Sequence, residues 1–270
     1  ARDVLVRGQG RDATSVDVLL ALMAADIQQG EFAQAEVGLS RALQVNAANE
    51  FIGLAWFAEW RDRGALAEGV ERVLARGDRK LLENVARGLR EALTRSDAAE
   101  LGSLVAQTLR QVVQSDAPVT QATVRAVRLL GEIGEESAVA VIRQFVERQL
   151  DALRLAAGAP RAREAAEAGI EALGALGQTA LLRELEEREQ IQEQVRLRTA
   201  VRKAVDEAQR QPQQDRAQRV ERARESLERL RFHPALERML AAPAATDRTL
   251  LDRLVARHAA IRDAFQAALS

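Results

Sequence analysis

Apolar residues recur three or four positions apart along most of this chain, the spacing that places them on one face of an α-helix. Glycines, prolines and capping residues interrupt the pattern and divide it into about a dozen predicted helices. No segment alternates β-branched and polar residues as a half-buried strand would. The pattern therefore predicts an all-α fold.

The interrupting residues also give the bounds of the helices that precede residue 178. Short connections separate these helices, so sequential helices are expected to pack as antiparallel neighbours. The predicted helices run from Thr14 or Ser15 to Gln29, Glu31 to Asn46, Ala48 to Arg63, Ala65 to Arg76, onward from Asp78, onward from Ser96 or Asp97, Pro118 or Thr120 to about Gly134, Glu135 to about Ala157, and Pro160 to Gly177.

Residues 14–47 place small and apolar residues in the order of a known repeat. The turn glycine lets the chain reverse, and two alanines let the helices approach closely. The segment resembles a tetratricopeptide repeat, and the resemblance implies that Phe32 fills the interior of the hairpin. Asp26 departs from the family by standing where an aromatic residue is usual, and Ala47 by standing where proline is usual. The matching residues are Leu19, Leu22, Gly30, Phe32, Ala35, Leu39 and Ala42, and a shift of 34 residues gives Gly64, Leu66, Gly69 and Val73 as a degenerate second unit.

A second period appears in the middle of the chain. The segment Ala126-Val-Arg-Leu-Leu-Gly-Glu-Ile-Gly134 aligns with Gly169-Ile-Glu-Ala-Leu-Gly-Ala-Leu-Gly177 at an offset of 43 residues. This ending resembles the first helix of a HEAT-type repeat, whose period lies in that range. Together the two resemblances imply a right-handed α–α superhelix, that is, a solenoid of helical hairpins. A non-repetitive helical bundle is the alternative.

The last third of the chain has a different character. No breaker interrupts Gln178–Gln211, which predicts one long helix of about 50 Å. A second charged helix over Asp215–Phe232 would pack against it as an antiparallel hairpin, and a final amphipathic helix from Thr246 or Asp247 to Leu269 would cap the stack. The predicted organisation is an N-terminal tail (1–13), tetratricopeptide-like hairpins (14–114), HEAT-like hairpins (115–183), and a long hairpin with its capping helix (184–270).

Composition removes several classes of function. The absence of cysteine excludes disulfides and thiolate zinc sites. His233 precedes a proline in a predicted turn and His258 lies on an apolar helix face, so structural roles are expected for both. We predict no catalytic residue, no cofactor and no metal site, and hence not an enzyme.

Net charge and hydropathy bear on where the chain acts. A net charge of −1 gives no overall attraction to nucleic acid or anionic membranes. No apolar run approaches the roughly 20 residues of a membrane-spanning helix, so we expect no membrane span and a cytoplasmic location. Because the chain begins at Ala1 without methionine, a leader or anchor removed from its start stays an open alternative.

The leading hypothesis is a non-enzymatic scaffold that binds a peptide or a partner subunit on the solenoid surface. Trp56 and Trp60 stand four residues apart and share one helix face, so they are candidate anchors, together with Asp26 and Gln29. The alternative for the two tryptophans is that they fill the core of an alanine-rich stack.

Two other functions use the C-terminal hairpin. Between Arg196 and Arg231 eleven basic residues outnumber six acidic ones, so a nucleic-acid partner could contact this ridge, although no aromatic residue interleaves for base stacking. The narrow apolar stripe on the long helix could instead form a homodimer. The candidate phosphate contacts are Arg198, Arg202, Lys203, Arg219 and Arg222, and the candidate dimer contacts are Ile191, Val195, Val201 and Val205.

Overall fold

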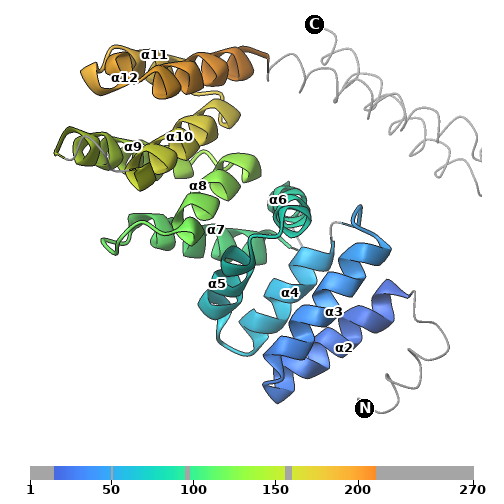
Figure 1. Ribbon diagram of the computed structural model, residues 1–270. Coiled ribbons are helices and arrows are strands. Elements are labelled where there is room, and N and C mark those ends of the chain that lie inside the picture. The colour runs from blue at the N-terminus through green and yellow to red at the C-terminus, as the bar shows by residue number, and fades with distance from the viewer. Residues whose placement is uncertain (1–14, 50, 95–97, 156–159, 211–270) are drawn as a thin grey trace, which may run out of the picture. The chain divides into compact units, whose positions relative to one another are not determined.

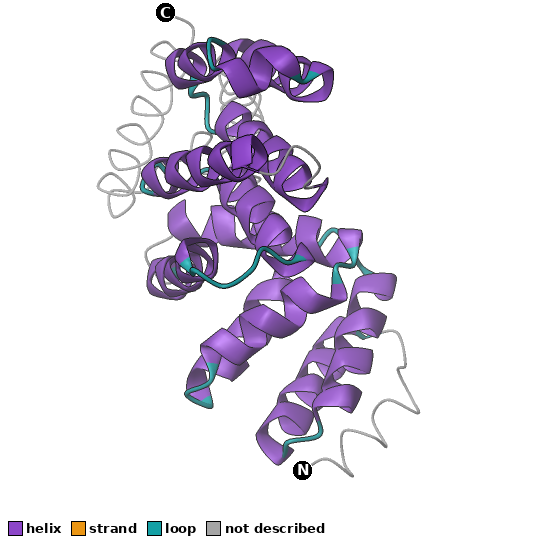
Figure 2. Cartoon of the chain, turned by 60° about the vertical axis from the view of Figure 1, so that its left-hand side comes forward, coloured by secondary structure: helices purple, strands orange, loops and turns teal. Residues whose placement is uncertain are grey.

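The computed structural model describes residues 15–49, 51–94, 98–155 and 160–210, and all regular structure in these ranges is helical (Figures 1 and 2). The all-α prediction is therefore confirmed for this part of the chain. The helices are α2 (Val16–Gln29), α3 (Phe32–Val45), α4 (Phe51–Asp62), α5 (Leu66–Arg76), α6 (Arg79–Thr94), α7 (Ala99–Gln114), α8 (Gln121–Ile133), α9 (Ala138–Leu155), α10 (Pro160–Ala175), α11 (Thr179–Glu186) and α12 (Glu189–Glu193), followed by a helix over 195–210.

Most of the predicted helix ends are confirmed. Thr120 caps α8 by accepting a hydrogen bond from the backbone N–H of Thr123, whose hydroxyl in turn accepts from the N–H of Thr120. Gly134 and Gly177 follow α8 and α10 with φ of 80° and 70°, in the left-handed region where glycine escapes the clash of a Cβ atom. These two glycines stand 43 residues apart, so the period found in the sequence is also a period of the backbone.

The helices pack in sequential pairs, and each pair packs on the next. Helix α2 lies against α3 and α4, α4 against α5 and α6, and α6 against α7 and α8, as the order of the helices in Figure 1 illustrates. Farther along, α8 and α9 both lie against α10. One continuous apolar core runs from Leu19 to Ala208.

Glycine is required where helices of neighbouring pairs approach most closely. A Cβ atom on Gly131 of α8 would lie 2.6 Å from the Cα atom of Ala172 in α10. One on Gly174 of α10 would lie 2.9 Å from the Cα atom of Ala204 in the helix over 195–210. Gly131 and Gly174 are 43 residues apart and occupy equivalent positions of α8 and α10. Each helix therefore packs on its neighbour through the same position of the repeat: α8 on α10 through Gly131, and α10 on the helix over 195–210 through Gly174.

Polar side chains repeat the same offset between α8 and α10. The amide of Gln121 donates to Glu164 at 2.9 Å, and the guanidinium of Arg128 contacts Glu171 at 3.2 Å, each pair 43 residues apart. Equivalent positions of successive helix pairs therefore face one another along this part of the core.

The single long helix predicted over Gln178–Gln211 is wrong. Helix α11 ends at Glu186, and the backbone is extended at Arg188 (φ −68°, ψ 135°) and again at Gln194 (φ −107°, ψ 106°), which separates α12 from the helix that follows.

The reason for these breaks lies in the spacing of the apolar residues. Leu185, Ile191 and Leu197 are six positions apart, so on one straight helix each would be rotated by about 240° from the one before. The two breaks bring all three into the core, where none is more than 1% exposed.

Phe32 also differs from its prediction. The interior of the α2–α3 hairpin is filled by side chains that include Met23 and Leu39, whereas Phe32 is only partly buried and stacks on Trp60 of α4 at 4.9 Å between ring centroids. It therefore contacts the next helix pair rather than filling its own hairpin.

Several predicted features lie outside the described residues and stay predictions. They are the N-terminal tail (1–13), the charged helix over Asp215–Phe232, the capping helix from Thr246 or Asp247, the two histidines His233 and His258, and the basic residues Arg219 and Arg222.

Candidate partner-binding site

The two tryptophans proposed as partner anchors lie inside the protein. Trp56 is 1% exposed and donates its indole N–H to the backbone carbonyl of Gly69 at 3.0 Å, while Trp60 is 0% exposed. Gly69 makes this burial possible, since a Cβ atom there would lie 2.5 Å from Cγ of Trp60. The core-filling alternative describes both residues, and neither offers an indole to a partner at the surface.

The other two proposed anchors do not join them. Asp26 of α2 is buried, whereas Gln29 is exposed in the last turn of the same helix. The four residues therefore do not form one groove, because three of them face the core and one faces outward.

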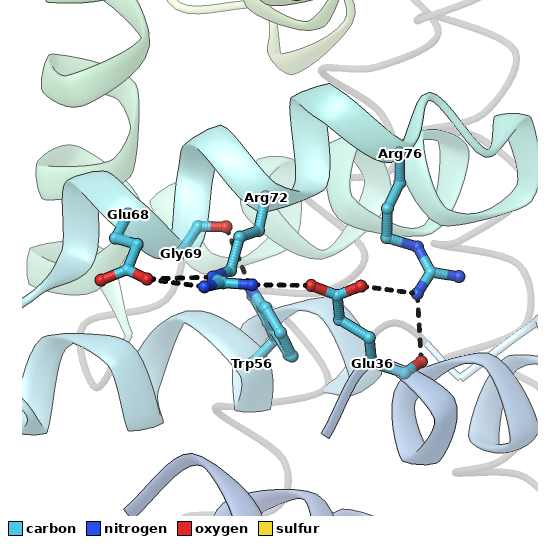
Figure 3. A network of polar contacts seen from close by, with 6 residues as sticks. All are labelled: Glu36, Trp56, Glu68, Gly69, Arg72 and Arg76. Carbon is cyan, nitrogen blue, oxygen red and sulfur yellow. Dashed lines mark hydrogen bonds and ion pairs between the residues drawn. The ribbon is translucent and has the colours of Figure 1, made fainter. Parts of the chain in front are cut away.

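Above the tryptophans, an arginine network joins α3 to α5. Arg72 donates to Glu68 at 2.8 Å on its own helix and to Glu36 of α3 at 3.0 Å, and Arg76 contacts Glu36 (Figure 3). Arg76 also donates to the hydroxyl of Ser40 at 2.6 Å. The hydrogen bond that Arg72 donates to the carboxylate of Glu68 is the main cause that raises the pKa of Arg72.

The same guanidinium also contacts aromatic rings. The Cζ atom of Arg72 lies 4.5 Å from the ring centroid of Phe32 and 5.4 Å from that of Trp60. With its donors on two carboxylates and its face on two rings, Arg72 serves as a structural link between helix pairs rather than as a site for an anionic ligand.

Asn84 is a buried polar residue that sequence reasoning missed. Its side-chain oxygen accepts from the backbone N–H of Gly53 at 3.0 Å, and its amide donates to the carbonyls of Ala47 and Asn49 at 3.2 and 2.7 Å. The sequence did carry a sign of this role, because Asn84 interrupts the apolar stripe of α6 three residues after Leu81. From α6, Asn84 therefore bonds the backbone of the turn that precedes α4 and of the first turn of α4.

One carboxyl group has a perturbed titration. Burial raises the pKa of Glu132, and repulsion from Glu83 raises it further, against the opposing effect of nearby arginines. Glu132 lies near the end of α8, close to both acidic and basic side chains. In the described part of the chain, no three metal-ligating side chains cluster closely enough to hold a metal ion.

An open apolar recess lies between α4, α6 and the start of α7. Its volume is about 300 Å³, and its walls are formed mainly by Phe51, Leu54, Ala55, Ala58, Ala92 and Leu101. Phe51 is 47% exposed, which is unusual for an aromatic side chain in a protein so poor in aromatic residues. Among the features of the described chain, this recess comes closest to the groove expected of a scaffold.

The basic residues proposed to contact phosphate are only partly available. On the helix over 195–210, Arg202 pairs with Glu186 at 3.4 Å, Arg198 is half-buried and Lys203 is exposed. A smaller hollow at the start of this helix, about 230 Å³ in volume, is lined by Arg163 and Arg196 among others.

The proposed dimer contacts do not form a surface stripe. Ile191 and Val201 are fully buried in the core of their own chain, and Val205 is half-buried. Val195 alone among the four is exposed, at 66%. The stripe expected on a long projecting helix does not exist, because the helix is broken and its apolar residues turn inward.

Comparisons with protein-family models, curated proteins and solved structures find no match to this chain. Within the described ranges, none of the helices is long and apolar enough to cross a membrane.

Proposed function

We propose that this chain is a non-enzymatic scaffold that binds a peptide or a partner subunit. We further propose that it is a right-handed α–α superhelix, with tetratricopeptide-like hairpins over 14–114 and HEAT-like hairpins over 115–183. Supporting this architecture, helices pack on those up to three places along in sequence, with the most extensive contacts to the next one or two, as in stacked hairpins. The recurring 43-residue offset of glycines and polar contacts supports the HEAT-like part.

The observation that carries the proposed function is the apolar recess beside Phe51. Elsewhere the helix pairs fill their core completely enough that Trp56, Trp60 and Phe57 are at most 1% exposed. Covering the walls of an apolar hollow of about 300 Å³, open in the described part of the stack, would remove apolar surface from water and so favour a bound ligand. A scaffold that uses this surface for a partner accounts for its presence.

The proposal is tested by affinity capture from the organism that makes the protein, followed by reconstitution. Each captured candidate is purified alone and titrated against the full chain by isothermal titration calorimetry. A saturable complex with a Kd in the micromolar range or tighter is expected. If no captured protein forms such a complex with the purified chain, the scaffold function is wrong.

A nucleic-acid partner is the second candidate, favoured by the excess of basic residues along 195–210, where Lys203 is exposed. Binding through phosphates would weaken steeply as salt is raised. A gel-shift titration with single- and double-stranded oligonucleotides at low and high salt separates the two proposals, because a protein scaffold gives no shift at micromolar concentration even at low salt.

A further inference from the structure

We draw no further inference here: the strongest candidate, the open apolar recess between α4, α6 and the start of α7, belongs to the candidate site already described, and nothing in the described part of the chain shows what covers it.

Discussion

Asn84 gives the sharpest test of how this fold is held together, because one fully buried side chain satisfies three backbone groups on another part of the chain. Replacing it by alanine leaves the N–H of Gly53 without its hydrogen-bond partner. The carbonyls of Ala47 and Asn49 keep second donors, because Arg87 reaches the first at 3.1 Å and the backbone N–H of Ile52 reaches the second at 3.4 Å.

The expected loss follows mainly from the N–H of Gly53. A buried donor left unsatisfied costs about 1–3 kcal/mol, so Asn84→Ala should lower the free energy of unfolding by about that amount. The control Arg87→Ala removes an exposed side chain that donates to the same carbonyl of Ala47, and should cost no more than about 0.5 kcal/mol.

Asn84→Asp separates hydrogen bonding from shape. It retains the acceptor for Gly53 but loses the amide donors, and it buries a carboxylate whose ionisation is disfavoured. The pKa of that carboxyl in the folded state would exceed its unfolded value, so the variant should gain stability relative to wild type as the pH is lowered.

Urea unfolding followed by circular dichroism measures these differences, and hydrogen exchange at the amide of Gly53 locates them. Protection of the first turn of α4 should fall more than protection of α10. The reasoning is refuted if Asn84→Ala costs no more than Arg87→Ala, or if exchange at Gly53 is unchanged.

Three further outcomes are expected. Gly131→Ala should lower stability by about 1–3 kcal/mol, because its Cβ would meet backbone, whereas Gly38→Ala, whose Cβ meets only ordinary contacts at 3.4 Å, should be neutral or stabilising in thermal melts. Ile191→Ala should cost about 2–5 kcal/mol and Val195→Ala almost nothing in urea unfolding; equal effects would contradict the observed helix breaks. Since the pKa of Glu132 is raised by folding, the contribution of this group to stability falls as the pH rises through and above the ordinary pKa range of a glutamate. Glu132→Gln should remove that contribution, so the urea midpoint of the variant should gain on that of the wild type between acidic and neutral pH.

The sequence predicted those parts of the fold that depend on local chemistry. A glycine in the left-handed region or a threonine capping box acts within a few residues, so Gly134, Gly177 and Thr120 could be recognised before any tertiary contact was known. The breaks at Arg188 and Gln194 carry no such signal. They arise because Ile191 and its neighbours gain more from a shared core than the chain loses by interrupting a helix.

The candidate site was harder to predict for a related reason. Two tryptophans on one helix face are compatible with a surface groove and with a core. The presence of Gly69 indicates a core, but only once α5 is known to pass close over Trp60. The recess depends on which faces of three helices remain uncovered, and a helical pattern shows which face is apolar but not whether another helix covers it. Phe51, an apolar residue at a helix start, carried no distinguishing mark.

Arginine at the helix ends shows what gives this alanine- and leucine-rich stack its register. The last carbonyls of a helix lack internal partners and attract cations. Here an arginine from another part of the chain donates to such carbonyls at the ends of α2, α5, α7 and α8. The pairs are Arg63 with Ile27 and Gln28, Arg125 with Leu74 and Ala75, Arg148 with Val113, and Arg90 with Glu132.

A guanidinium has donors enough to reach two adjacent carbonyls at once, as Arg63 and Arg125 do, and its fixed geometry orients the helices that it joins. An ammonium group is a point charge and would hold a helix end less specifically. Small apolar side chains pack in several registers at similar cost, so directional bonds at the helix ends select one of them. In the sequence these arginines look like ordinary solvated charges, because their acceptors are backbone carbonyls that any residue could supply.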